Sequence, residues 1–199
     1  MHKMLDSERL GDRQDGLLQL SPDPDHPQYD SICFKGNRIY QHNIMRVNYT
    51  TYDIRHAQDI INPKTDQRNV MLLSFDDSNP TRHQYSYARV LGVFHAYVVH
   101  TGNRMLDYNA RRMEFLWVRW YEVVDDCNVQ VGWRSAQLDR LRFPSMEEDE
   151  SFGFLDPALV LRASHILPML AAGLRHPNGG GISFCAQNSD DWHEYCMNR

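Results

Sequence analysis

The hydrophobic positions along this chain come in short runs that are separated by polar turns. The runs are rich in β-branched and aromatic residues, which favour strands over helices. The ranges that predict strands are 38–55 (one long strand or a hairpin), 70–75, 85–100, 111–122, 137–143, 164–170, and a terminal pair at 182–187 and 191–198. This pattern predicts a mostly β fold and does not fit an amphipathic helical bundle.

Two local signals refine this prediction. Gly92 interrupts the apolar run 85–100, and a glycine at such a place indicates a bulge or a sharp bend. Asp156-Pro157 combines a helix N-cap with a residue suited to the first turn, and predicts one short helix from about 157 to 162. The strand pattern with this bend predicts a small, strongly bent β-barrel with one short helix, and we expect a Src-homology-3-like or bromo-adjacent-homology-like type.

The start of the chain has a different composition. Residues 1–30 are polar, and Pro22, Pro24 and Pro27 fall within an Asp-rich run. Such a segment buries too little apolar area to offset its ordering entropy, so we expect a disordered arm. Residues 31–199 are enough for a single domain with its own core. No apolar run approaches the roughly 18 residues that span a bilayer, so no membrane partner is expected.

The densest aromatic stretch is RRMEFLWVRWYE, residues 111–122. In a strand, successive side chains point to opposite faces, and both faces of this stretch are apolar at the centre. This favours a strand buried on both sides, with Trp117 and Val118 in the core. Alternatively, Arg119, Trp120 and Tyr121 form a stacking surface for bases, or part of an aromatic cage for a methylated lysine. The sequence leaves both interpretations open.

Charge is distributed unevenly along the chain. The formal net charge is −5, which argues against a wholly basic nucleic-acid binder, yet residues 81–142 carry 9 basic against 6 acidic side chains. All the basic residues of that segment are arginines, which suit bidentate contacts with phosphates. The candidate nucleic-acid-binding residues are Arg111, Arg112, Arg119, Trp120, Tyr121, Arg134, Arg140 and Arg142. A solvated face with local salt bridges is the alternative for these arginines.

Signals for catalysis and metal binding are weak. No nucleophile elbow, P-loop or dinucleotide fingerprint occurs, and neighbouring Ser164 and His165 would point to opposite faces of an extended chain. We therefore expect no catalytic residue, metal or cofactor, and four reduced thiols in a cytosolic or nuclear protein. The weak candidates are Cys185, His193 and Cys196 for zinc, Cys127 for a Cys–His pair, and Asp53, Asp107, Asp125 and Asp126 for a metal-dependent nuclease.

Several longer motifs resemble a known family. The motifs are VNYTTYDIRHAQDIINP (47–63), YARVLGVFHAYV (87–98), RRMEFLWVRWYE (111–122), GWRSAQLDRLRF (132–143) and FGFLDPALVLRASHILP (152–168). Together, over residues 39–198, they resemble the C-terminal region of fungal DNA-transposon proteins of the Plavaka and Kyakuja–Dileera–Zisupton type. They are also similar, more weakly, to the small C-terminal domain of plant CACTA-type transposon proteins.

The resemblance implies a biological role for the chain but identifies no active-site residues. In such elements the catalytic RNase-H-like domain lies N-terminal to this region, and we expect this chain to be a fragment or decayed copy of a longer reading frame, truncated at its C-terminus. We expect a non-catalytic accessory module, nuclear or cytoplasmic, that engages DNA or chromatin. The alternatives are a protein-interaction module that holds transposase subunits together, and a cryptic metal-dependent nuclease. No small-molecule substrate is expected.

Overall fold

The computed structural model describes residues 32–50, 56–74, 84–100, 108–124 and 139–198. These residues form strands joined by turns and by three short 3₁₀ helices, so the predicted mostly β fold is confirmed. The strands are β1 (Ile32–His42), β2 (Met45–Thr50), β3 (His56–Ile61), β4 (Asn69–Leu73), β5 (Tyr85–His100), β6 (Arg111–Val123), β7 (Arg140–Arg142), β8 (Phe152–Leu155), β9 (Arg162–Ala163), β10 (His165–Pro168) and β11 (Tyr195–Asn198). The 3₁₀ helices are η3 (Asp149–Ser151), η4 (Pro157–Leu159) and η5 (Leu170–Ala172).

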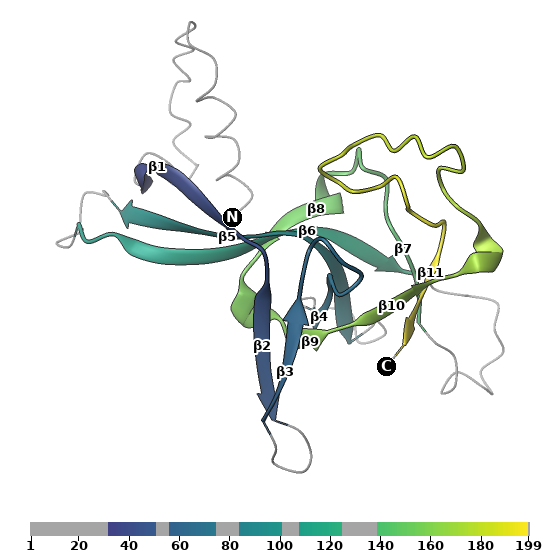
Figure 1. Ribbon diagram of the computed structural model, residues 1–199, viewed down its shortest axis with the longest axis horizontal. Coiled ribbons are helices and arrows are strands. Elements are labelled where there is room, and N and C mark those ends of the chain that lie inside the picture. Colours follow the sequence, from purple (N-terminus) through teal and green to yellow (C-terminus); the bar gives the residue numbers. More distant parts are fainter. Residues whose placement is uncertain (1–31, 51–55, 75–83, 101–107, 125–138, 199) are drawn as a thin grey trace, which may run out of the picture.

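The two longest strands, β5 and β6, form the centre of an antiparallel sheet (Figure 1). On its other edge, β5 pairs with β4 along its first half and with β1 along its second half. The other edge of β6 pairs with β8 and then with β7, and β7 leads on to β11 and β10. Among the described strands this order stays open, running from β10 to β9 without a pair that closes a barrel.

A hairpin of β2 and β3 forms a second, two-stranded sheet. β1 ends at His42 and β2 begins at Met45, so the chain passes from the large sheet to the hairpin within two residues. Met45 and Val47 of β2 and Ile61 of β3 pack on a buried apolar cluster that includes residues of β4, β5, β6 and β8. The predicted strand or hairpin at 38–55 is therefore divided between both sheets.

The central strand β6 is buried on both faces, as its sequence indicates. Leu116 and Val118 belong to the apolar cluster on which the β2–β3 hairpin packs, which we call the cluster beneath the hairpin. Phe115 lies in a separate cluster with Ala96 and Val98. Trp117 is only half-buried, and its ring stacks on Phe152 of β8 at 5.6 Å between centroids. A third cluster, around Tyr87, Tyr121, Leu141, Phe143, Ile166, Tyr195 and Met197, joins the sheet to the C-terminal segment.

The local predictions have mixed outcomes. The predicted bulge at Gly92 is confirmed, because the β5–β6 register shifts between Val90 and Gly92. The predicted helix at 157–162 is only the 3₁₀ turn η4, although Asp156 caps it as expected by accepting a hydrogen bond from the Ala158 N–H at 2.9 Å. The chain returns to extended backbone soon after this turn, and β9 begins at Arg162.

The predicted terminal pair of strands is only partly confirmed, because β11 forms within 191–198 but no strand forms at 182–187. Residues 182–187 form turns, and β11 pairs with β10 and β7 instead. The reason is that β11 buries Tyr195 and Met197 against the third cluster, whereas Ile182 and Phe184 remain exposed. The predicted arm at 1–30 lies outside the described residues. No helix in the described part of the chain is long and apolar enough to cross a membrane.

Candidate nucleic-acid interface

The second half of β5, paired with β1 and the first half of β6, projects beyond the core as a three-stranded arm (Figure 1). Residues that face each other across an antiparallel pair lie on the same side of the sheet. The register places Tyr40 and Glu114 opposite His95, and Arg112 opposite Tyr97. One side of the arm therefore carries aromatic and charged residues together.

The opposite side of the arm is apolar. There Ala96, Val98 and Phe115 are buried, and half-buried Phe34 and Ile39 pack against them. Because this side is committed to packing, the alternation along β5 forces His95 and Tyr97 onto the other side. The alternation of side chains along the strands therefore places the aromatic and charged residues together on one side of the arm.

The aromatic rings on this side form a connected group. The rings of His42 and His95 stack at 4.8 Å, and the ring of Tyr40 stacks on His95 at 4.8 Å with an interplanar angle of 12°. Tyr97 meets Tyr40 edge-on, at 6.3 Å and 84°. Tyr40 is 41% exposed and Tyr97 is 37% exposed, so both rings are open to a ligand.

A bulge in β1 places two cations beside these tyrosines. Phe34 pairs with Val98 and Ile39 pairs with Ala96, so residues 35–38 stand opposite the single residue Tyr97. The bulge passes through positive φ at Gly36 (69°), a conformation that favours glycine, and again at Asn37. It lines a pocket of about 380 Å³ together with the two tyrosines; the lining residues are Lys35, Gly36, Arg38, Tyr40 and Tyr97.

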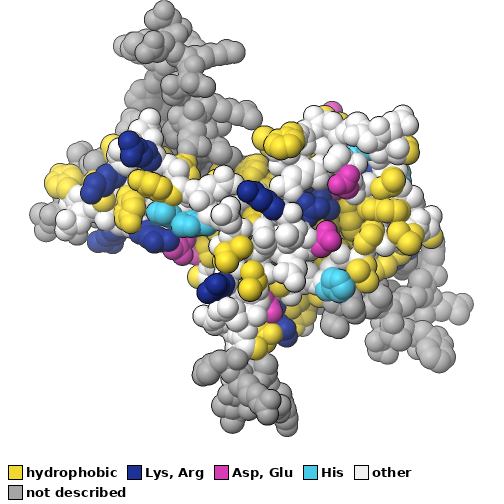
Figure 2. All heavy atoms as spheres, viewed as in Figure 1, with side chains coloured by type: hydrophobic (Ala, Val, Ile, Leu, Met, Phe, Trp, Pro, Cys, Tyr) yellow, Lys and Arg dark blue, Asp and Glu magenta, His cyan; other side chains and the backbone are white. Residues whose placement is uncertain are grey.

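The charges around this pocket are mostly positive. Neither Lys35 nor Arg38 forms an ion pair with any residue that the structure describes, and both are exposed. Arg112 pairs with Glu114 at 2.8 Å, but both side chains are about half exposed, so a stronger anion can compete for Arg112. Figure 2 shows Lys and Arg side chains beside His and apolar side chains over this arm.

His42 and His95 contact each other through ring nitrogens, His42 Nε2 and His95 Nδ1, at 2.6 Å. One nitrogen must donate and the other accept, so the contact fits a pair that carries at most one positive charge. Burial, then the nearby Arg112 and His42, lower the pKa of His95 below its ordinary value. The basic side chains on this side of the arm are Lys35, Arg38 and Arg112.

The structure places the candidate nucleic-acid-binding arginines at different ends of the sheet. Arg111 and Arg112 are exposed at the start of β6, on opposite sides of the arm. Arg140 and Arg142 belong to β7, which pairs with the far end of β6, and they form ion pairs with Glu194 (2.5 Å) and Glu122 (2.9 Å). Ten residues of strand separate Arg112 from Glu122, roughly 33 Å. The four described arginines Arg111, Arg112, Arg140 and Arg142 therefore do not form one compact face, and Arg134 lies outside the described residues.

The aromatic end of the predicted site lies inside the fold. Arg119 is 1% exposed, and Tyr121 is buried, where its hydroxyl donates to Asn69 Oδ1 at 3.2 Å. Trp120 is half-buried and packs against the cluster beneath the hairpin. Burial takes Arg119 and Tyr121 away from any surface that a nucleic acid could contact. The interpretation of this stretch as core therefore describes its structure better.

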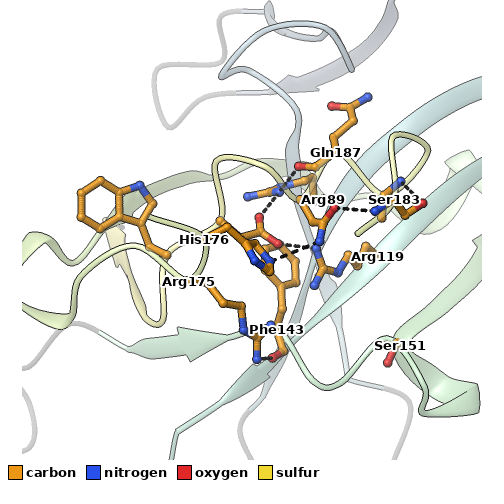
Figure 3. Close-up of polar contacts among 12 residues, drawn as sticks. Arg89, Arg119, Phe143, Ser151, Arg175, His176, Ser183 and Gln187 are labelled. Atoms are coloured by element: carbon orange, nitrogen blue, oxygen red, sulfur yellow. Dashed lines mark hydrogen bonds and ion pairs between the residues drawn. The ribbon is translucent and has the colours of Figure 1, made fainter. Parts of the chain in front are cut away.

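Arg119 belongs instead to a buried ionic cluster with Arg89 of β5 (Figure 3). The two guanidinium groups donate to the two oxygens of Asp191, Arg89 at 2.6 Å and Arg119 at 2.5 Å. Both also lie over the ring of Phe143, at 4.4 Å and 4.0 Å from its centroid. Burial opposes the charge on Arg89, but Tyr121, Asp191 and Tyr195 outweigh it and raise the Arg89 pKa. This cluster links β5 and β6 to the segment that precedes β11.

The remaining candidates are not assembled. Within the described residues, no group of three His, Cys, Asp or Glu side chains is placed to hold a metal ion. Cys185 is exposed in a turn, whereas Cys196 is half-buried in β11. Ser164 is buried and His165 is exposed, consistent with opposite directions along the chain. The positions of Asp53, Asp107, Asp125, Asp126 and Cys127 lie outside the described residues.

Sequence reasoning missed Lys35, Arg38, Tyr40 and Tyr97. A signal was present in Gly36-Asn37, a turn pair inside an otherwise strand-like stretch, which indicates a bulge. The pairing register that brings this bulge beside Tyr97 cannot be read from one sequence. Comparisons of the chain with protein-family models, curated proteins and solved structures found no match.

Proposed function

We propose that this chain is a non-catalytic nucleic-acid-binding module that engages DNA through the arm of β1, β5 and β6. The observation that carries the proposal is the position of Lys35 and Arg38, two cations without ion pairs to described residues, beside the exposed rings of Tyr40 and Tyr97. Cations attract the phosphate backbone, and exposed aromatic rings offer stacking surfaces for bases. Arg112 on the same side adds a third cation.

The small number of cations limits the strength of binding. If three side chains each neutralise one phosphate, the affinity for duplex DNA should fall about 40-fold between 50 and 200 mM salt. The net charge of −5 opposes non-specific attraction elsewhere on the molecule. Binding is therefore expected to be weak and local to the arm, as suits an accessory module that acts beside other DNA contacts.

The biological setting of the proposal comes from the resemblance to transposon proteins. A module of this kind would help a transposase to engage DNA or chromatin while the catalytic domain resides elsewhere. The strong bend from β1 into the β2–β3 hairpin, and the bulge at Gly92, are compatible with a barrel of Src-homology-3-like or bromo-adjacent-homology-like type. This finer classification is part of the proposal.

The test is fluorescence anisotropy of a labelled 20-base-pair duplex titrated with the protein at about 50 and 200 mM salt. The double variant Lys35→Ala/Arg38→Ala should weaken binding to all duplex sequences and flatten the salt dependence. The matched control, Lys64→Ala/Arg46→Ala, removes the same charge from two exposed residues outside the arm. An equal loss in both double variants, or no binding at 50 mM, would contradict the proposal.

A second candidate function is self-association, or assembly with transposase subunits. It is favoured by the loop after η5, where Phe184 is 96% exposed and Ile182 is 77% exposed, so that a partner could bury two large apolar side chains there. Sedimentation velocity over a wide range of concentrations tests it for a second copy of the chain. The wild type should show a concentration-dependent increase in mass that Phe184→Ser removes, and a constant monomer mass would count against self-association.

A further inference from the structure

The pocket on the arm has two aromatic walls. Its aromatic walls are Tyr40 and Tyr97, with ring planes at 84°. Such perpendicular rings could form either a cage for a methylated ammonium group or a slot for a flat ring. The remaining walls decide between these ligands, because they carry charge.

Lys35 and Arg38 line the same pocket and have no ion pair with a residue in the described ranges. Two cations that no described acidic residue pairs with repel a methylated lysine, which must bring a third positive charge to the same place. They attract a ligand that combines a flat ring with negative charge nearby. A nucleotide, with its base and its phosphates, has that combination.

The rings also define how a base can enter. His95 covers one face of Tyr40, so the surface that Tyr40 offers to a ligand belongs to the other face and the rim of its ring. A base stacked there would extend the series of rings His42, His95 and Tyr40 by one member. Tyr97, which meets Tyr40 edge-on, would close the side of the slot.

We propose that the pocket of Tyr40 and Tyr97 takes an unpaired base of a single-stranded nucleic acid, with Lys35 and Arg38 on the flanking phosphates. In a duplex the faces of the bases are stacked on one another, so an intact duplex can offer only phosphates to this surface. A single strand offers phosphates and base faces together. This inference rests on the proposed function and names its preferred substrate.

The experiment compares a labelled 20-mer of thymidine with a 20-base-pair duplex at 50 mM salt, by anisotropy. The single strand should bind about fivefold to a hundredfold more tightly, the range that stacking of one base contributes. A 20-mer of abasic residues should lose the same factor. If the duplex binds as tightly as the single strand, or the abasic strand binds as tightly as thymidine, the inference is overturned while the proposed function stands. If nothing binds, both fail.

Variants of the two rings test the position of the base. Tyr40→Ala should weaken binding of the thymidine strand about fivefold or more and leave duplex binding nearly unchanged, whereas Tyr40→Phe should keep the affinity. Tyr97→Ala serves as a second variant should Tyr40→Ala not fold, as judged by circular dichroism. Tyr49→Ala removes a tyrosine of the β2–β3 hairpin and should have no effect on affinity. Equal affinity of Tyr40→Ala, Tyr97→Ala and wild type would overturn the inference.

Discussion

Asp191 Oδ2 accepts a hydrogen bond from Arg119 Nη1 at 2.5 Å, although the two residues are 72 positions apart and both are buried. The other oxygen of Asp191 accepts from Arg89 at 2.6 Å. One carboxylate thus balances two guanidinium groups inside the protein, and it joins the segment before β11 to β5 and β6. A buried charge without a partner is costly, so the fold depends on this link.

Replacing Asp191 by Asn should strongly destabilise the protein. The amide keeps the size of the side chain but leaves Arg89 and Arg119 as buried cations without a counter-charge, at an expected cost of about 3–5 kcal/mol. Urea unfolding followed by circular dichroism measures the change in the free energy of unfolding. The control is Asp190→Asn, which makes the same change at an exposed neighbour and should stay within about 0.5 kcal/mol of wild type. Similar midpoints for both variants would show that the buried cluster is not needed.

Trp117 is half-buried, and its ring connects β6 to the aromatic rings of β8. It stacks on Phe152 and lies 5.0 Å from the ring of Phe154. Because Trp117 is half-buried, Trp117→Ala should destabilise the fold by about 3 kcal/mol, the lower end for such a truncation. Thermal unfolding measures the effect, and Trp117→Phe, which keeps a ring on Phe152, should recover most of the loss. A melting temperature close to that of wild type for Trp117→Ala would mean that this stack carries little of the stability.

Gly92 lies opposite Trp117 at the point where the register of β5 shifts. A Cβ atom at this position would lie 2.3 Å from Cε2 of Phe94, whose ring stacks on Phe115. Gly92→Ala should therefore displace the Phe94 ring and destabilise the arm by about 1–3 kcal/mol. The double variant Gly92→Ala/Phe94→Leu, which shortens the obstructing side chain, should lose less than the sum of the single changes in urea unfolding. Strict additivity would show that the two positions are not coupled.

Local features of the fold could be predicted from the sequence where one side chain decides them. The run Tyr85–His100 has no turn residue except Gly92, and it forms a strand over that whole range with the bulge at the glycine. Asp156 and Pro157 formed the expected cap. The burial of β6 on both faces also followed from its alternation, because apolar residues occupy both faces at its centre.

The candidate site could not be predicted, because it depends on contacts between distant segments. Arg119 is a charged residue within an apolar run, and its buried counter-charge, Asp191, is 72 residues away in the sequence. Likewise, Lys35 reaches Tyr97 through the β1–β5 register, a pairing between separate parts of the chain. Patterns along a strand indicate which face a residue lies on, but not which strand lies beside it.

Tyr121 should make the protein sensitive to alkali. Burial raises the pKa of its hydroxyl to about 12, despite the opposing effect of Arg89. Below pH 10 the tyrosine is neutral in both the folded and the unfolded state. Between pH 10 and about 12 only the unfolded state releases the proton, so the free energy of unfolding should fall as pH rises. Tyr121→Phe should reduce this slope in urea unfolding at a series of pH values, and an unchanged slope would contradict the assignment.

His95 should make the protein sensitive to mild acid, in the opposite direction. Burial, Arg112 and His42 lower its pKa in the folded state, while Glu114 opposes them, and stacking against Tyr40 keeps the ring in place. Above the unfolded-state pKa of about 6.5, histidine is neutral in both states and its contribution to stability is constant. As the pH falls below that value, the unfolded state takes up a proton first, so the free energy of unfolding should decrease.

Urea unfolding between pH 7.5 and 5 measures this effect of His95, with His95→Gln as the test variant. Glutamine keeps a hydrogen-bonding side chain toward His42 but does not titrate, so the variant should lose stability less steeply on acidification than wild type. His165→Gln is the matched control, because His165 is exposed at the start of β10, and it should keep the slope of wild type. A wild-type slope in His95→Gln would place the acid sensitivity in another group. A reduced slope would show that the aromatic side of the arm responds to protons.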